Sequence, residues 1–165
     1  MGSSIYYNDE GTIFTSNANR IFFGGGGGSG TQSLVPSIPA SKGGTGGGIV
    51  VIIADTIVAE QKDATSRYAI KANGESVTDV AMAGAGGGGA GGCIVLDVNH
   101  YSTELSLYAD GGDGGNTSNT FYTGPGGGGA GGVFWVRESD QLNYSISNSY
   151  GAGGRWLNDT DPAVY

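Results

Sequence analysis

The most constraining feature of this sequence is a repeated junction between a run of glycines and a run of large apolar residues. The segments "GGTGGGIVVIIADTIV", "GGGGAGGCIVLDV" and "GGGGAGGVFWV" begin at Gly43, Gly86 and Gly126. Glycine loses more conformational freedom on folding than any other residue, so a flexible linker is a common context for it. An apolar run, in contrast, enters a core. Glycine tracts that recur at matched positions beside core segments therefore predict an ordered structure.

The three junctions belong to one repeating unit. The first residues after the glycines are Ile49, Cys93 and Val133, at intervals of 44 and 40 residues. A second, alternating segment follows each apolar run, and these segments begin at Tyr68, Leu105 and Tyr144. Such alternation is typical of a strand with one buried face. We therefore interpret the unit as a glycine tract, a buried strand, a short turn, a half-buried strand and a polar loop.

The fold class that follows is all-β. Strong helix formers are sparse, whereas Ile, Val, Thr and Tyr are common, which favours extended structure. The chain has 165 residues, 35 of them glycine and only 4 proline, without a Gly-X-Y period, so it is one domain and not collagen. We predict a single glycine-rich β domain, residues 1–165. It divides into an opening cap (1–30), three repeat units (43–83, 84–123 and 124–150) and a closing cap (151–165).

The glycine tracts are predicted to pack side by side as polyproline-II-like helices beside a small β-sheet or sandwich. Polyproline II has three residues per turn and no internal hydrogen bonds, so its N–H and C=O groups need outside partners when they are buried. Neighbouring tracts supply those partners, at a net gain of about 0.5–1.5 kcal/mol per hydrogen bond. The absence of Cβ atoms lets the backbones approach closely.

These motifs resemble known glycine-rich domains. The segments "KANGES…GAGGGGAGGCIVLDV" and "YADGGDGGNTSN…GPGGGGAGGVFWV" are similar to glycine-rich segments of Bacteroidetes surface and gliding-associated proteins. More distantly, they resemble the polyglycine-II regions of T-even-type phage tail-fibre adhesins and the glycine-rich region of anaplastic lymphoma kinase. The resemblance implies an extracellular or cell-surface, non-catalytic module whose recognition sites lie in loops between tracts.

Composition excludes several classes of partner and reaction. The formal net charge is −8 with only 7 Lys and Arg, so we expect neither nucleic acid nor an anionic membrane as a partner. Gly-x-Gly-x-x-Gly occurs repeatedly, but a dinucleotide site needs a strand before the motif and a helix after it. His100 is interpreted as a turn residue and Cys93 as a small buried hydrophobe. We expect no enzyme activity, no catalytic residue and no cofactor.

The acidic turns are expected to be solvated. "DGGDGGN" and "NDTDP" make Asp110, Asp113, Asp159 and Asp161 weak candidates for calcium, but calcium requires six or more oxygen ligands. Calcium binding is therefore the alternative, and the prediction for the metal site is none.

Binding is assigned instead to the loops that lead into the glycine tracts. Loops grouped on a rigid scaffold are where recognition usually resides, and an aromatic side chain in a polar loop can stack on a sugar or a protein. The predicted binding residues are Phe121, Tyr122, Asn119, Leu34 and Val77. The predicted function is part of an adhesin or surface fibre that binds a glycan or protein. The alternatives are a structural spacer or self-assembling fibre subunit, with adjoining domains or copies of itself as partners, and a phage receptor-binding tip.

Overall fold

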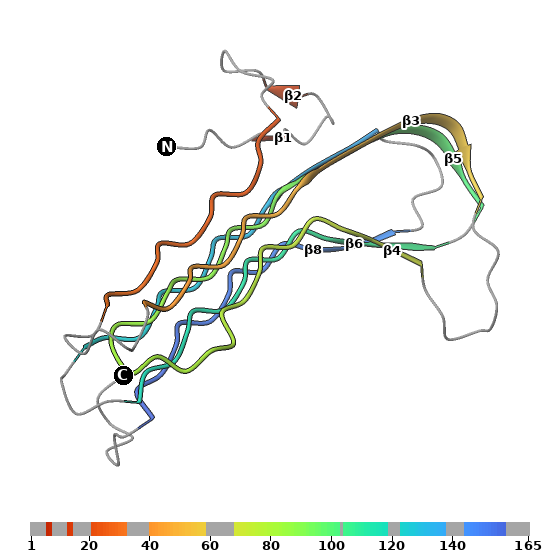
Figure 1. The fold of residues 1–165 in the computed structure, drawn as a ribbon. Helices are drawn as coiled ribbons and strands as arrows, with labels where there is room; N and C mark the ends of the chain where they lie inside the picture. Colours follow the sequence, from red (N-terminus) through yellow and green to blue (C-terminus); the bar gives the residue numbers. More distant parts are fainter. Residues whose placement is uncertain are drawn as a thin grey trace.

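The computed structural model describes residues 6–7, 13–14, 21–32, 40–58, 68–102, 104–118, 123–137 and 144–157. Within these ranges the fold is all-β, as predicted, and it contains no helix. Figure 1 shows two small sheets at one end and long, wavy backbone segments that extend from them. The strands are β1 (Tyr6–Tyr7), β2 (Ile13–Phe14), β3 (Ile49–Ile57), β4 (Tyr68–Lys71), β5 (Cys93–Tyr101), β6 (Leu105–Tyr108), β7 (Val133–Val136) and β8 (Tyr144–Ser147).

Two parallel three-stranded sheets carry the repeat. One has the strand order β3-β5-β7 and the other β4-β6-β8, while β1 and β2 form a separate antiparallel pair. In the first sheet Cys93 pairs with both Ile49 and Val133. In the second sheet Leu105 pairs with both Tyr68 and Tyr144. Both alignments predicted from the sequence are therefore confirmed as strand registers, and each unit gives one strand to each sheet.

The hydrophobic core is centred on the middle strand of each sheet. Ile94, Leu96 and Val98 of β5 cluster with Leu105 and Leu107 of β6, and all five are buried. The alternation expected of strands with one covered face is present in β5, where the intervening positions are more exposed.

The prediction of a buried first strand in each unit is wrong for β3 and β7. The side chains of β3 alternate between half-buried and exposed positions, with Ile53 76% exposed, and all four residues of β7 are half-buried. The reason is that β3 and β7 are the edge strands of their sheet, whereas β5 has a neighbour on each side. An apolar run without alternation therefore does not by itself predict a strand that is buried on both faces.

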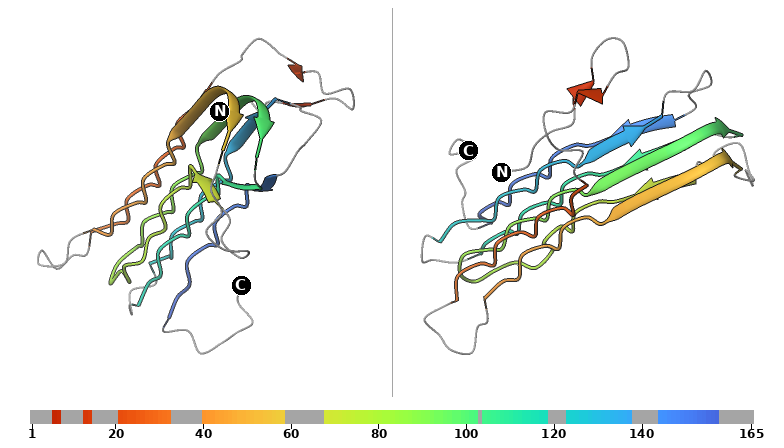
Figure 2. Two further views of the ribbon diagram at one scale, coloured as in Figure 1. Left: turned by 90° about the vertical axis from the view of Figure 1, so that its right-hand side faces the viewer. Right: turned by 90° about the horizontal axis from the view of Figure 1, so that it is seen from above.

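Seven extended segments continue from the strands and run side by side (Figures 1 and 2). We call them tract A (residues 24–30), tract B (41–48), tract C (72–77), tract D (84–92), tract E (109–117), tract F (124–132) and tract G (148–156). Tracts B, D and F lead into β3, β5 and β7, whereas tracts C, E and G follow β4, β6 and β8. The sequence predicts a polar loop from Glu75 and acidic turns over 110–116, which is corrected here: these residues of tracts C and E are part of the bundle.

Backbone hydrogen bonds join the tracts into layers. Tract B donates to tract D and tract D to tract F, all in the same direction. Tract C donates to tract E and tract E to tract G in a second layer, which runs antiparallel to the first. Tract A lies against tracts B and D on the other side of the first layer, where it donates to B and accepts from D.

Close packing requires glycine at particular positions in these tracts. A Cβ atom added to Gly89 would overlap the carbonyl oxygen of Thr45, and one on Gly112 would overlap that of Glu75. Neither obstacle is a flexible side chain that can move aside, because both are backbone atoms of another tract. Glycine at these positions is therefore a condition of the fold.

Candidate functional site

Tract D is the centre of the bundle, and its N–H groups point in three directions. The N–H of Gly87 donates to the Gly28 carbonyl of tract A at 2.9 Å, and the N–H of Gly88 donates to the Gly127 carbonyl of tract F at 2.9 Å. The N–H of Gly89 donates to the Glu75 carbonyl of tract C at 3.0 Å. Tract D also accepts hydrogen bonds from tracts B and E. Three successive residues thus bind three different neighbours.

The pattern repeats every third residue. The donors to tract F are Ala85, Gly88 and Gly91, and those to tract A are Gly87 and Ala90. Tract E has the same arrangement: Gly112 and Gly115 donate to tract D, whereas Gly111, Gly114 and Thr117 donate to tract G. A period of three leaves each tract with a third row of N–H groups. What this third row contacts differs between the two outer faces of the bundle.

On the outer side of the C–E–G layer, oxygen atoms of side chains accept hydrogen bonds from the third row of N–H groups. The N–H of Asp110 donates to Asn73 Oδ1 at 3.0 Å, and the N–H of Asp113 donates to Ser76 Oγ at 2.8 Å. Asp110 Oδ1 accepts in turn from the N–H of Ser149. Asp113 Oδ1 and Asn116 Oδ1 accept from the N–H groups of Ala152 and Arg155, each at 2.7 Å. We call this side the capped face.

The acidic residues that the sequence offered as calcium candidates lie on this face. Asp110 and Asp113 each use a carboxylate oxygen to accept backbone N–H groups. Asp159 and Asp161 lie outside the described residues. Among the residues that the structure describes, no group of three or more His, Cys, Asp or Glu side chains could hold a metal ion.

A further acidic cap lies at the edge of tract B. Glu75 Oε2 accepts from the N–H of Thr45 at 2.9 Å and from its Oγ1 at 2.8 Å. These two hydrogen bonds, the backbone one first, hold the pKa of Glu75 below its usual value. The side chain therefore takes the place that a neighbouring tract would occupy.

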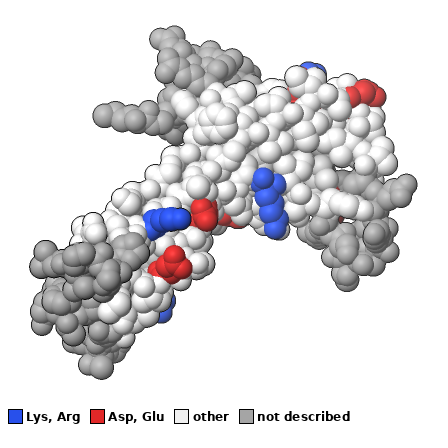
Figure 3. Space-filling model, viewed as in Figure 1, with Lys and Arg blue, Asp and Glu red and all other residues white. Residues whose placement is uncertain are grey.

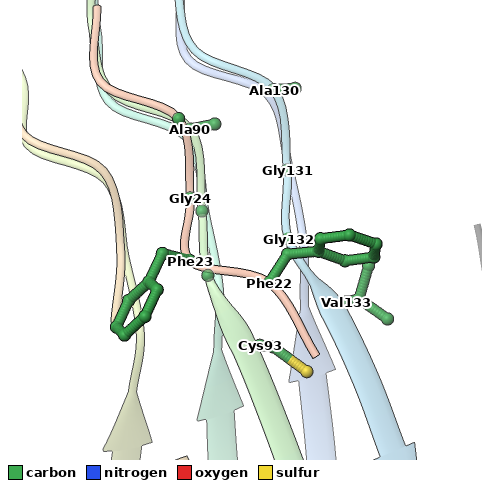
Figure 4. Close-up of a pocket in the computed structure, with 12 residues that line it drawn as sticks. Phe22, Phe23, Gly24, Ala90, Cys93, Ala130, Gly131, Gly132 and Val133 are labelled. Carbon is green, nitrogen blue, oxygen red and sulfur yellow. The ribbon is translucent and has the colours of Figure 1, made fainter. Parts of the chain in front are cut away.

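The opposite side of the bundle has a groove between tracts A and F, with tract D as its floor. At the end nearest the sheets its volume is about 430 Å³, and it is lined by residues 22–25, 90–93 and 130–133. Figure 4 shows Phe22 lying beside Val133, while Phe23 points the other way. Along the groove, Gly25, Gly28 and Gly127 are exposed. We call this side the open face.

The predicted binding residues are only partly placed. Phe121, Tyr122, Asn119 and Leu34 lie outside the described residues. Val77 is half-buried in tract C, where its N–H donates to the Asp113 carbonyl at 2.9 Å. The ends of tracts A and E that adjoin these segments lie away from the sheets (Figure 1).

Three residues with side chains that enzymes often use, Cys93, Asp97 and His100, lie along strand β5. Cys93 is buried, as predicted, and burial raises the pKa of its thiol. His100 is exposed and pairs with Thr56 inside the parallel sheet, so its assignment to a turn was wrong. Asp97 forms an ion pair with Arg137, and this hydrogen bond lowers the pKa of Asp97. Burial in the core thus accounts for Cys93, strand pairing for His100 and the ion pair with Arg137 for Asp97.

Sequence reasoning missed the residues that define the capped face. Asn73 and Ser76, and likewise Asp110, Asp113 and Asn116, are three residues apart. That spacing was the available signal, because it equals the three-residue period at which the hydrogen bonds between tracts recur. It was read as a set of polar turns, since Asn, Asp and Ser are frequent in turns.

On the side drawn in Figure 3, a few acidic and basic side chains are scattered over a surface that is otherwise uncharged. No helix that would be long and apolar enough to span a membrane occurs among the described residues. Comparison of the chain with protein-family models, with curated proteins and with solved structures finds no match.

Proposed function

We propose that this chain is a non-enzymatic module of an extracellular or cell-surface protein, in which a stiff bundle of glycine tracts positions loops for contact with a glycan or a protein. The finer architecture that belongs to this proposal is a packing of polyproline-II-like helices of the polyglycine-II type. The three-residue period of the hydrogen bonds supports it, because polyproline II has three residues per turn.

The observation that carries the proposal is the bonding of tract D to five neighbouring tracts. A tract held on so many sides is rigid, although its sequence is almost entirely glycine. Rigid scaffolds with loops at one end are a common basis for recognition, because the loops are positioned before they bind. The bundle is therefore suited to holding binding loops in fixed positions.

The loop flanks are tied to one another at the end away from the sheets. Thr117 forms bridges with Ala81 and with Trp156. Ser118 donates its N–H to the Ala81 carbonyl, and Leu157 donates to the Thr117 carbonyl. These contacts join the ends of three segments that are far apart in the sequence, which supports a single recognition surface.

A glycan array and a cell-surface binding screen test the proposal. We expect the wild type to bind and the double variant Phe121→Ala/Tyr122→Ala to lose at least about tenfold in affinity, the effect of about 1.4 kcal/mol. Tyr150→Ala is the matched control, because Tyr150 is an aromatic residue on tract G that is 83% exposed. Equal binding by all three proteins would remove the loop assignment. Absence of binding by the wild type would leave a structural spacer as the function.

A further inference from the structure

The open face has the form of an unfilled position in the bundle. We propose that the groove between tracts A and F binds an extended, glycine-rich segment of a separate polypeptide, which lies on tract D and runs antiparallel to D and F. Its expected length is about seven residues, that of tract A. This inference does not depend on the loops or on the function proposed for them.

Tract A provides the template, because it fills the equivalent groove between tracts B and D. Its N–H groups donate to three carbonyls of tract B, those of Gly47, Gly44 and Ser41, at 2.8 Å each. Its own carbonyls accept from the N–H groups of Gly87 and Ala90 of tract D. An extended backbone is thus recognised by one row of carbonyls and one row of N–H groups.

The same two rows recur one step further along the layer, without a partner. The strand register relates B to D as it relates D to F. The equivalent carbonyls belong to Gly91, Gly88 and Ala85, and the equivalent N–H groups belong to Gly127 and Ala130. Among the residues that the structure describes, none of these carbonyls accepts and none of these N–H groups donates a hydrogen bond.

Two of the unpaired carbonyls belong to buried residues. Gly88 and Gly91 are both buried at the floor of the groove. Backbone polar groups in buried positions are nearly always paired, because leaving one without a hydrogen bond is costly. A backbone seated in the groove would supply the missing donors.

The composition of the groove walls also points to a backbone ligand. A Cβ atom added to Gly25, Gly28, Gly124 or Gly127 would meet no atom within 4 Å. The packing of this chain therefore does not explain glycine at these four positions. On the capped face the outward positions carry Asn, Asp and Ser instead. Glycine on the open face keeps the groove clear, as close approach by another backbone requires.

The template also specifies the glycine pattern of the ligand. Cβ atoms on Gly24, Gly27 and Gly30 of tract A would overlap carbonyl oxygens of tract D. The bound segment must therefore have glycine at three positions spaced by three, whereas the positions between them can carry a small side chain, as Ser29 shows in tract A. A second copy of this chain is a poorer ligand, because all seven of its tracts are already hydrogen-bonded within its own bundle.

The experiment uses a synthetic peptide with the sequence of residues 24–32, GGGGGSGTQ. The control peptide has alanine at the positions of Gly24, Gly27 and Gly30. Binding is measured by titration calorimetry and by the NMR shifts of the Gly127 and Ala130 amides. We expect the first peptide to bind and to shift the signals of both amides. The control peptide should bind at least about tenfold more weakly, because its alanine Cβ atoms would overlap carbonyl oxygens of tract D and displace the peptide backbone. The loss of one backbone hydrogen bond has about that effect.

Two protein variants locate the site. Gly127→Leu places a side chain in the groove, where a Cβ atom meets nothing, so the fold is retained. Gly153→Leu is the matched control on tract G, because its Cβ atom has only one neighbour, 4.0 Å away. We expect Gly127→Leu to weaken binding of the peptide by about tenfold or more and Gly153→Leu to leave it unchanged.

Three results would overturn the proposal: no binding by the wild type, equal binding of the two peptides, or equal binding by Gly127→Leu and the wild type. If the wild type dimerises with concentration and Gly127→Leu does not, the ligand is a second copy and the proposed separate polypeptide is wrong. If Gly127→Leu fails to fold, the comparison of the two peptides on the wild type still decides.

Discussion

The two outer faces of the glycine bundle end the same hydrogen-bonding pattern in different ways. On the capped face, side chains of Asn73, Ser76 and Asp113 accept the outward N–H groups of the next tract. On the open face, the N–H groups of Gly127 and Ala130 donate no hydrogen bond within the described part of the chain. On the capped face the outward N–H groups are hydrogen-bonded by side chains, whereas on the open face they have no such partner in the described part of the chain.

The difference shows that a glycine bundle has the same problem as a β-sheet with exposed edges. Each outer tract presents a row of unpaired backbone groups to which another chain can be added. Polar side chains at every third residue close that row within the chain itself. Where they are missing, the bundle can be extended, and this is the physical basis of the ligand proposed for the open face.

The largest expected effect separates two glycines of the same tract. A Cβ atom on Gly129 would overlap the Gly89 carbonyl, whereas one on Gly127 would meet nothing within 4 Å. We expect Gly129→Val to lower the free energy of unfolding by about 3 kcal/mol, the upper range for overpacking. Gly127→Val should change it by less than about 0.5 kcal/mol. Urea denaturation measures both, and equal midpoints would contradict close packing of the tracts.

Hydrogen exchange compares two segments of identical sequence, of which one is covered by tract A and the other lines the open groove. Residues 86–92 and 126–132 both read GGGGAGG, but the N–H groups of Gly87 and Ala90 donate to tract A. Those of Gly127 and Ala130 have no partner in the described structure. We expect the first pair to exchange about a hundredfold more slowly by NMR, because hydrogen-bonded amides exchange only after opening. Similar rates would remove the distinction between the two sides of the bundle.

A moderate effect is expected from removing one cap. Asp113→Ala deletes the oxygen that accepts the Ala152 N–H at 2.7 Å. The loss in unfolding free energy should be about 1 kcal/mol, as for a side chain that caps a helix N-terminus. Asp113→Asn keeps an acceptor at the same place and is the control in urea denaturation. If the Asn and Ala variants are equally stable, the side chain does not act as a cap.

The smallest effect is a dependence of stability on pH at the edge of tract B. The hydrogen bonds from Thr45 keep the pKa of Glu75 low in the folded state. The stability gained from them is fully present above the unfolded pKa of about 4.3 and is lost as the pH falls through the folded value. We expect the wild type to lose slightly more stability than Glu75→Gln between pH 5 and pH 3, taken as roughly the carboxylate range. Thermal unfolding measures this difference. If the melting temperatures of the two proteins fall by the same amount between those pH values, the ionisation of Glu75 is not linked to folding.

The repeat and its register were predictable from the sequence. The equivalence of Ile49, Cys93 and Val133 predicted which residues pair across β3, β5 and β7. It worked because parallel strands from successive units align when the units have similar lengths. Tracts C and E were missed, since Asn73 and Asp110 stand where glycine would have marked a tract. The open groove was not predictable, because it requires the position of tract A relative to tracts D and F.

The sequence by itself determined the all-β class, the repeating unit and the strand register, because apolar alternation and repeat spacing are properties of the chain taken locally. Only the tertiary structure decided which glycines are indispensable. Gly129 and Gly127 stand in one uniform run, and they differ only in what lies next to them in space. It also decided that Asp113 caps a backbone N–H. Both outcomes depend on contacts with neighbouring tracts that are about forty residues away along the chain. The three-residue spacing of polar residues marks a tract, but it does not say which other tract lies beside it.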